Sequence, residues 1–467
     1  MERTLAADTT AKTDQEVLLK GWVNSVRKHG NVTFIDLRDR TGLVQVVFAD
    51  ELLGSSEELK PEYVVEIEGV VRERGERYKN PKLASGDVEV GATKLTVLNE
   101  ADTPPFPLDT DGLEIDEDLR LEYRYLDLRR TRMTQNIRKR SEMTQFVRNW
   151  LVNEGFAEIE TPVITKTTPE GARDFLIPSR LQPGNFYALP QSPQQYKQML
   201  MVAGFERYFQ LARCFRDEDP RADRAYGEFT QIDIEMSFVT QEDIMNLAET
   251  MFTELVETLF PEKRIKQKPW PRIPYHEAME KYNSDKPDLR DDKDDPNELA
   301  FAWVVDFPLF AEQTDDDFYH GSGSAKFAPS HHMFTAPHPD DIGLLSTDPM
   351  KARGLQHDMV LNGSEVGGGS IRIHDAKIQE TIFELIGFSE EQKAQFTHML
   401  KAFTYGVPPH GGVAPGLDRL LYRILGEPNL REVMAFPAQA SGRISVMDAP
   451  SPVDKSQLDE LHISVRE

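Results

Sequence analysis

Phe215-Arg216-Asp217-Glu218-Asp219, followed by Glu228-Phe229-Thr230-Gln231-Ile232-Asp233-Ile234-Glu235, is the stretch on which the predicted fold of this chain rests. An arginine leads into a run of acids, and apolar and polar residues then alternate as in a half-buried strand. Two later segments suit a polyphosphate ligand: Glu365-Val366-Gly367-Gly368-Gly369-Ser370-Ile371-Arg372-Ile373 and Gly416-Leu417-Asp418-Arg419. The glycines let a ligand approach the backbone closely. Each segment alone is a weak signal, but their order in one chain is far more specific.

The residues around these segments predict an α+β body. Apolar residues recur at helical spacing over 143–151, and Glu154-Gly155 ends that helix. Strands are expected at 186–189, 208–212, 229–236 and 302–305, and helices at 195–203 and 241–260. We therefore expect an antiparallel sheet accompanied by helices.

The first hundred residues predict a separate β-barrel. Five runs alternate between apolar and polar residues: 17–23, 32–37, 43–48, 63–71 and 88–98. A helix is expected at 51–60, between the third and fourth runs. Five strands and one helix suit an OB-fold, although SH3-like barrels share much of this pattern. We expect a barrel domain over 1–102, a proline-rich hinge over 103–119 and the α+β domain over 120–467.

Composition excludes several classes of protein. No run approaches the ~18 apolar residues of a membrane span, and the N-terminus lacks the pattern of a signal peptide, so a cytoplasmic protein is expected. Cys214 is the sole cysteine, which excludes an intramolecular disulfide, a cysteine zinc site and an iron–sulfur cluster. The formal charge of −25 argues against nonspecific DNA binding.

A basic stretch departs from this acidic average just beyond the expected hinge. It contains Arg120, Arg124, Arg129, Arg130, Arg132, Arg138, Lys139 and Arg140. A phosphate backbone could rest on these cations, or they could form a solvated helix face paired with its own acids. The sequence leaves the two alternatives open.

Taken together, the segments resemble the class II aminoacyl-tRNA synthetases nearly end to end. The first family motif matches the helix that ends in Gly155-Phe156 with Glu160-Thr161-Pro162, the second matches 215–235, and the third matches Gly416-Leu417-Asp418-Arg419. Within the class, the chain resembles the aspartate enzymes of the bacterial type. The segments that match this subgroup are Gln191-Ser192-Pro193-Gln194 with Lys197-Gln198, Thr168-Pro169-Glu170-Gly171-Ala172-Arg173, and His331-His332 before Phe334-Thr335.

The resemblance implies an architecture and two departures from it. It implies an OB-fold anticodon-binding domain, a catalytic domain whose mostly antiparallel sheet is flanked by helices, and a homodimer formed through the first motif. Bacterial relatives carry an insertion domain between the second and third motifs, where this chain has only a short acidic loop near 288–298. Pro415 stands where a phenylalanine is usual, beside the expected nucleotide pocket.

The implied reaction joins L-aspartate to ATP and then to the terminal adenosine of tRNA(Asp), with ATP as substrate, Mg²⁺ as cofactor and no zinc. Arg216 would bind the α-phosphate and Arg419 the γ-phosphate, with Glu218 beside ATP, Phe229 stacked on adenine, and Asp358 and Glu365 holding magnesium. Lys197 and Arg372 would select the side-chain carboxylate of aspartate. The other residues implied at the aspartate site are His331 and His332 near that carboxylate, and Glu170, Gln194 and Asp233 around the ammonium group.

On the barrel, the resemblance places Phe34 and Gln45 on the middle anticodon base, with Arg27 and Glu89 nearby. Two positions bear on the choice of tRNA. His29 stands where relatives that also charge tRNA(Asn) tend to have histidine, whereas Arg77 stands where strict enzymes tend to have lysine. The two markers disagree, with a slight preference for relaxed choice.

Two alternatives stand beside this hypothesis. One is an asparagine or lysine enzyme of the same subclass, which Lys197 and the 191–194 segment disfavour. The other is a noncatalytic RNA-binding paralogue, which the intact charged residues of the three segments disfavour. A histidine metal pair at His331-His332 is also disfavoured, because neighbouring side chains diverge on a strand.

Overall fold

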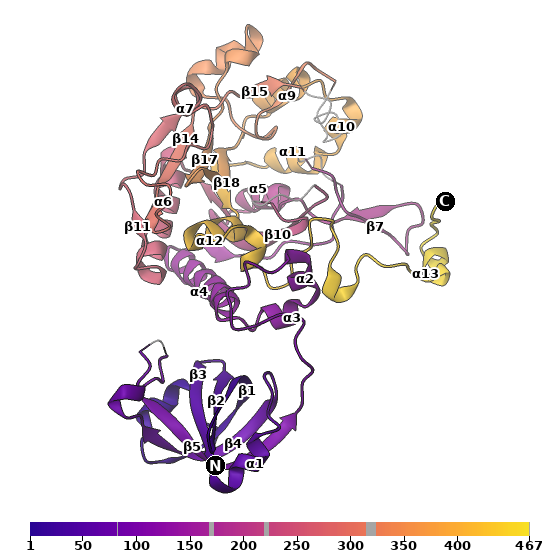
Figure 1. Ribbon diagram of the computed structural model, residues 1–467. Coiled ribbons are helices and arrows are strands. Elements are labelled where there is room, and N and C mark those ends of the chain that lie inside the picture. Colours follow the sequence, from indigo (N-terminus) through magenta and orange to yellow (C-terminus); the bar gives the residue numbers. More distant parts are fainter. Residues whose placement is uncertain (82, 168–171, 219–223, 314–323, 467) are drawn as a thin grey trace. The chain divides into compact units, whose positions relative to one another are not determined.

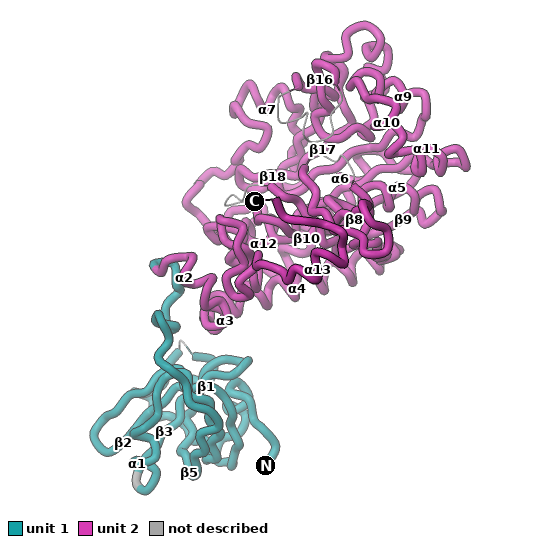
Figure 2. The backbone as a smooth tube through the Cα atoms, turned by 90° about the vertical axis from the view of Figure 1, so that its right-hand side faces the viewer, with its two compact units in different colours: residues 1–114 teal, residues 115–467 magenta. Residues whose placement is uncertain are grey.

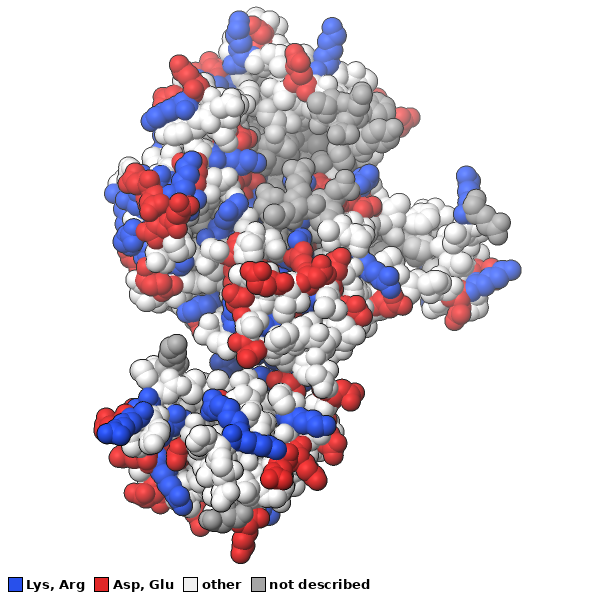
Figure 3. All heavy atoms as spheres, viewed as in Figure 1, with Lys and Arg blue, Asp and Glu red and all other residues white. Residues whose placement is uncertain are grey.

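The computed structural model describes residues 1–81, 83–167, 172–218, 224–313 and 324–466 (Figure 1). The chain divides into two compact units, residues 1–114 and 115–467, which Figure 2 shows in different colours. On the visible face of each unit, acidic and basic side chains are interspersed (Figure 3). No helix in the described ranges combines the length and the apolar character needed to cross a bilayer.

In the described part of the first unit, five strands close into a barrel, which confirms the expected architecture. Its strands are β1 (Glu16–His29), β2 (Val32–Asp39), β3 (Gly42–Ala49), β4 (Val64–Glu73) and β5 (Val88–Asn99). Alternate residues of these strands fill the barrel core, as the period of two predicted. The expected helix at 51–60 is much shorter, because only α1 (Leu53–Ser56) is helical after a 3₁₀ turn.

The second unit is built on one large sheet. In its described residues, eight strands run in the order β12-β14-β17-β18-β19-β10-β9-β6. Their bounds are β6 (Ala157–Glu158), β9 (Arg207–Arg216), β10 (Gly227–Ser237), β12 (Arg272–Pro274), β14 (Phe301–Val305), β17 (Gln356–Leu361), β18 (Ser364–Ile371) and β19 (His410–Pro415). The six central strands pair antiparallel, as expected, whereas β12 and β6 join the edges in parallel.

The described part of the second unit also contains helices. They are α2 (Glu117–Glu122), α3 (Arg124–Asp127), α4 (Thr131–Asn153), α5 (Gln194–Val202), α6 (Gln241–Leu259), α7 (Tyr275–Tyr282), α9 (Ala376–Leu385), α10 (Glu390–Ala394), α11 (Thr397–Phe403), α12 (Leu417–Leu425) and α13 (Lys455–Glu460). Apolar residues of α4, α6 and α12 pack with those of the sheet into one buried cluster. Short strand pairs lie outside the large sheet: β7 (Leu176–Pro178) with β8 (Phe186–Ala188), β11 (Arg264–Ile265) with β13 (Glu298–Leu299), and β15 (Phe310–Glu312) with β16 (Phe327–Pro329).

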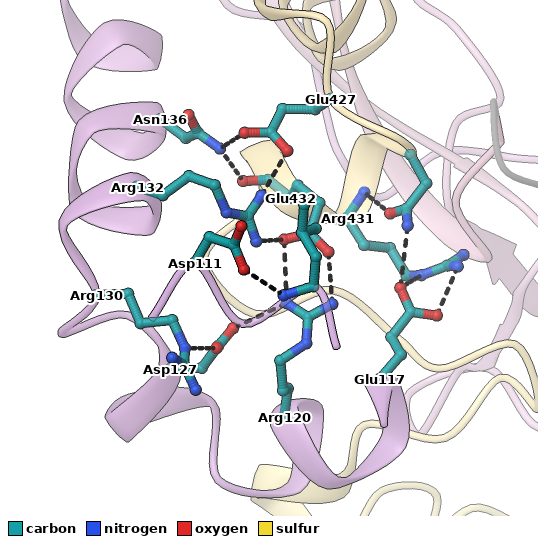
Figure 4. A network of polar contacts seen from close by, with 12 residues as sticks. Asp111, Glu117, Arg120, Asp127, Arg130, Arg132, Asn136, Glu427, Arg431 and Glu432 are labelled. Atoms are coloured by element: carbon teal, nitrogen blue, oxygen red, sulfur yellow. Dashed lines mark hydrogen bonds and ion pairs between the residues drawn. The ribbon is translucent and has the colours of Figure 1, made fainter. Parts of the chain in front are cut away.

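Part of the basic stretch forms a buried ion network (Figure 4). Arg120 donates two hydrogen bonds to Glu432, at 3.1 and 2.7 Å, and Arg124 and Arg130 both pair with Asp127. All five of these side chains are buried. For these three arginines neither alternative from the sequence is right, since they form neither a phosphate-binding surface nor a solvated helix face. They tie the start of the unit to the 3₁₀ turn Leu430–Val433 that follows α12.

We predict that Glu432→Gln lowers the free energy of unfolding by roughly 3 kcal/mol, because it leaves Arg120 and Arg132 facing a neutral amide in a buried site. Burial acts to raise the pKa of Glu432, but the hydrogen bonds and charge of Arg120 outweigh it and hold that pKa below 4.5. The contribution is therefore present above pH 4.5 and is lost as the pH falls through the lowered pKa. Denaturant unfolding at pH 7 and pH 4 measures both effects.

The matched control is Arg148→Met, which breaks the more exposed pair between Arg148 and Glu158. Such a pair contributes less than about 1 kcal/mol. A loss for Glu432→Gln no larger than that of the control would contradict the assignment of this network as a buried structural element.

Candidate active site and nucleic-acid face

A cavity of about 780 Å³ gathers the residues predicted for the catalytic domain. Of these, all but Glu170 line it, and Glu170 lies outside the described residues. The predicted residues found there are Gln194, Lys197, Arg216, Glu218, Phe229, Asp233, His331, His332, Asp358, Glu365, Arg372 and Arg419. They come from α5, β9, β10, β17, β18 and α12 and from the loops beside them, so the folded sheet brings together side chains that are far apart in the sequence.

Four buried charges lie together beside the cavity, and Lys197, Asp233 and Arg372 among them line it. Lys197 Nζ lies 2.6 Å from Asp233 Oδ1 and 3.4 Å from Glu235 Oε2. Arg372 donates from Nε and Nη2 to the two carboxylate oxygens of Glu235, at 3.0 and 3.2 Å. Two cations and two anions balance, which is what burial of charge requires. The sequence prediction missed Glu235, although it is two residues after Asp233 on β10 and therefore on the same face of the strand.

The two carboxylates differ because their partners differ. Burial acts to raise the pKa of Glu235, but Arg372 and Lys197 overcome it and lower the pKa to about 2. For Asp233, burial outweighs Lys197 and the pKa is raised. Asp233 Oδ2 is buried and accepts no hydrogen bond from the described residues, and the hydroxyl of Tyr208 on the neighbouring strand donates to Gln210. A buried carboxylate oxygen without a donor fits a cationic group of a ligand.

The two neighbouring histidines also line the cavity, where His332 contacts Arg372. Their ring centroids are 4.4 Å apart, so the expectation that the side chains diverge on a strand is wrong, because this segment is a loop. His332 Nε2 lies 2.6 Å from Arg372 Nη1, and it accepts there because a guanidinium can only donate. Burial, with Arg372 adding to it, lowers the pKa of His331 to about 3. Burial, with His331 and Arg372 adding to it, also lowers the pKa of His332 well below its ordinary value of 6.5, so both rings are neutral near pH 7.

The cavity lining also contains the cations Arg216 and Arg419 and an aromatic platform, the ring of Phe229. The guanidinium of Arg216 lies 5.1 Å from the centroid of the Phe229 ring, on the neighbouring strand. Glu218 pairs with Arg224. Arg419, from the start of α12, donates from Nη1 to the carbonyl oxygen of Glu365 at 2.9 Å and to its carboxylate at 2.6 Å.

Asp358 and Glu365 are the carboxylates that could hold a cation. Burial and the negative charge of Glu365 raise the pKa of Asp358 well above its ordinary value of 3.8, although Gln356 donates to it. No group of three or more histidine, cysteine, aspartate or glutamate side chains in the described ranges is arranged to hold a metal ion. Two carboxylates without further protein ligands suit Mg²⁺, which takes its remaining oxygens from water and phosphate.

The glycine triplet serves the sheet as well as the cavity. A Cβ on Gly369 would lie 2.2 Å from the carbonyl oxygen of Gly412, and one on Gly367 would lie 2.7 Å from Cα of Pro415. Only Gly368 lines the cavity. Pro415 therefore packs against β18, while Ala414 and Gly416 on either side of it line the cavity.

Asp418 joins three elements around the cavity, which the sequence did not indicate. Its Oδ2 accepts from the backbone N–H of Thr230 at 2.9 Å, next to Phe229. Its other oxygen pairs with Arg140 of α4. This contact holds the start of α12, and with it Arg419, against the strand that carries the aromatic platform.

The predicted residues on the barrel also lie together. Arg27 Nη2 donates to Asp36 at 2.9 Å and to Gln45 Oε1 at 3.3 Å, and Gln45 Nε2 donates to Glu89 at 2.9 Å. Phe34 is half-buried and lies opposite Arg27 in the β1–β2 register. A stacking ring, a cation and an amide on neighbouring strands are what recognition of single-stranded RNA requires. His29 and Arg77 are both exposed.

We predict that Asp358→Asn stabilises the protein in the absence of ligands, because it removes a buried charge that Glu365 repels. Because the pKa of Asp358 is raised in the folded state, the folded protein binds the proton of this carboxyl more tightly than the unfolded chain does. The resulting contribution to the free energy of unfolding is fully present below pH 3.8 and is lost as the pH rises through the folded-state pKa. The variant should therefore unfold at a higher temperature than the wild type at pH 8, with a smaller difference near pH 4. An equal or lower unfolding temperature at pH 8 would contradict this account of Asp358.

Each of the two units of the chain matches a known protein family. Residues 116–440 match the family model of the class II tRNA synthetases (D, K and N), and residues 17–98 match that of the OB-fold nucleic acid binding domain. The chain is 41% identical to the aspartate–tRNA(Asp/Asn) ligase of Rubrobacter xylanophilus, covering 97% of this chain and 94% of that protein. It is 40% identical to the aspartate–tRNA ligase of Geobacillus kaustophilus, covering 100% and 99%.

Solved structures show the same fold. The structure described as a putative aspartyl-tRNA synthetase from Leishmania major superposes with a TM-score of 0.75 at 22% identity, over 93% of each chain. The asparaginyl-tRNA synthetase from Pyrococcus horikoshii superposes with a TM-score of 0.73 at 23% identity, over 94% of this chain and 98% of that one. On the family match and on the full-length relatives, this chain belongs to the class II tRNA synthetases of the D, K and N group.

Proposed function

We propose that this protein is an aspartate–tRNA ligase, which joins L-aspartate to ATP and transfers the aspartyl group to tRNA(Asp). The observation that carries the proposal is the buried end of the cavity. Lys197 and Arg372 offer cations to a side-chain carboxylate, and the unpartnered Asp233 Oδ2 offers an acceptor to an ammonium group. A neutral asparagine side chain would offer these cations no negative charge, which makes its binding less favourable than that of aspartate by about a few kcal/mol. The names of the full-length relatives agree with this assignment.

The first step needs positioning and charge neutralisation rather than proton transfer. A carboxylate oxygen of aspartate forms a bond to the α-phosphorus of ATP, the bond from that phosphorus to the bridging oxygen breaks, and pyrophosphate leaves. Arg216 neutralises the α-phosphate in this proposal, which is supported by its closeness to Phe229, the ring proposed to stack on adenine. Glu218 lies beside ATP, and Arg419 holds the γ-phosphate at the far end of the cavity.

Magnesium fits the pair Asp358 and Glu365, because a cation there would relieve the repulsion that raises the pKa of Asp358. When bound, Mg²⁺ neutralises charge on the phosphates and orients them. The residues around the amino acid need no metal for their part. Lys197, Arg372, His331 and His332 hold and orient the side chain, and Gln194, Asp233 and Glu170 hold the ammonium group.

In the second step a hydroxyl of the terminal adenosine forms an ester with the aspartyl carbonyl carbon, and AMP leaves. The barrel selects the tRNA through its anticodon, with Phe34 stacking on a base and Gln45 bonding to its edge. Arg27 and Glu89 hold the Gln45 amide in place from both ends. tRNA(Asn) is a candidate second acceptor: His29 favours it, whereas Arg77 favours strict choice of tRNA(Asp). The relatives include one named an aspartate–tRNA(Asp/Asn) ligase and one named an aspartate–tRNA ligase.

The proposal also includes a homodimer and the absence of the insertion domain that bacterial relatives carry. Pro162, Val163 and Ile164 form an exposed segment shortly after α4, which suits an interface. The molar mass in solution tests the homodimer, since the monomer has a mass of 53.2 kDa.

The alignment with the Rubrobacter relative spans 578 positions against 467 residues here, so at least 111 positions have no residue in this chain. We place that loss at the acidic loop near 288–298.

Amino-acid-dependent exchange of pyrophosphate into ATP tests the activity. We expect exchange with aspartate and not with asparagine or lysine, followed by charging of purified tRNA(Asp) with labelled aspartate. Exchange with asparagine or lysine instead would identify a sister enzyme. The absence of exchange with all three amino acids would overturn the proposal and favour a noncatalytic RNA-binding protein. Charging of tRNA(Asn) at the same enzyme concentration decides between strict and relaxed choice.

We predict that Phe34→Ala lowers kcat/KM for charging of tRNA(Asp) by about tenfold to a hundredfold, because stacking on one base contributes ~1–3 kcal/mol. Aspartate-dependent pyrophosphate exchange should stay unchanged, since it does not involve tRNA. Lys20→Ala is the control, because this residue is a cation on the same strand as Arg27 but seven positions away. An equal effect of both substitutions on charging would contradict the assigned face.

A further inference from the structure

The amide of Gln194 is held in one orientation at the edge of the cavity. Gln194 begins α5, lines the cavity and is 6% exposed. Its Nε2 donates a hydrogen bond to Oε1 of Gln198, one helical turn later, at 3.0 Å. The amide nitrogen is thus turned toward the protein, which leaves Oε1 of Gln194 as the atom available to a ligand.

The orientation of Gln198 is fixed in turn by His410. Nε2 of Gln198 lies 3.1 Å from Nε2 of His410, and Nδ1 of His410 lies 2.8 Å from the backbone carbonyl oxygen of Pro408. A carbonyl can only accept, so Nδ1 carries the hydrogen, and Nε2 of the neutral ring is then an acceptor. Gln198 must therefore donate with its nitrogen to His410, and its oxygen is left for Gln194.

Burial makes this chain of contacts rigid. Gln198 and His410 are both 0% exposed, so water cannot replace a lost hydrogen bond. Burial also lowers the pKa of His410, and Arg372 acts in the same direction while Glu235 opposes it, which keeps the ring neutral. The backbone carbonyl of His410 accepts from the N–H of Arg372 at 2.9 Å, so the same residue also supports the cation of the aspartate site.

We propose that Gln198 and His410 are positioning residues which fix the polarity of the Gln194 amide, so that the site binds α-amino acids and disfavours dicarboxylic acids that lack the amino group. A flipped Gln194 would turn its NH₂ toward the ligand ammonium, and two donors would face each other. With the oxygen presented, Gln194 Oε1 and Asp233 Oδ2 are two acceptors for one ammonium group, which requires up to three. The inference rests on the proposed function, because it assigns the ammonium of aspartate to this end of the cavity.

The test compares aspartate with succinate, which has both carboxylates but no amino group. In Gln198→Met the Gln194 amide is free to rotate, so we expect KM for aspartate in pyrophosphate exchange to rise about tenfold. The inhibition constant of succinate and KM for ATP should change less than about twofold. A merely structural role would weaken aspartate and succinate together, because both contact Lys197 beside Gln198. That result, or an unchanged KM for aspartate, would overturn the proposal.

Two further variants sharpen the test. Gln195→Met is the matched control, because Gln195 is on the same helix, is also 6% exposed and lies outside this chain of contacts. It should leave both constants unchanged. In a Gln194→Glu background the Gln198→Met substitution should no longer raise KM for aspartate, since a carboxylate accepts from either oxygen. Persistence of the full effect in that background would overturn the inference. Absence of aspartate-dependent exchange in the wild type would instead overturn the proposed function itself.

Discussion

The pairing of Lys197 and Arg372 with Asp233 and Glu235 is the interaction on which the cavity depends. An unpaired charge in a buried site costs several kcal/mol, so α5, β10 and the residue after β18 must meet in the arrangement that pairs all four. Once they meet, the pairs leave Asp233 Oδ2 without a donor. The same contacts that stabilise the sheet therefore also create the polar end of a ligand site.

Close strand packing supplies the second constraint. Gly367 and Gly369 let β18 approach β19 where any side chain would collide with backbone atoms. This brings Glu365, before the glycines, near Arg419 after β19, and Asp418 then fastens α12 to β10. The phosphate end of the cavity is thus a consequence of how tightly the central strands pack, and the buried contact with Arg140 extends this support to α4.

Charged residues in this protein fall into two groups that the sequence does not separate. Three arginines, Arg120, Arg124 and Arg130, form the buried network with Asp127 and Glu432. Two others, Arg216 and Arg419, line the cavity. The difference lies in partners, not in residue type. A buried arginine whose contacts are all within the protein stabilises the fold, whereas Arg419, which pairs with Glu365 at the cavity lining, can also contact a phosphate there.

By itself, the sequence determined the barrel and the α+β body with its antiparallel centre, because alternation and helical spacing are local properties of the chain. The charged residues expected at the site followed from the resemblance of its motifs to a family, and Glu235 was not among them. Only the tertiary structure decided the partners. Glu235 meets Arg372 across 137 positions, and Arg120 meets Glu432 across 312. Gln198 and His410 are likewise distant in sequence, and although Gln198 stands in a quoted motif, nothing in that motif indicates its contact with His410. The physical reason is that burial and hydrogen-bond polarity belong to contacts between distant segments, which exist only once the sheet has closed.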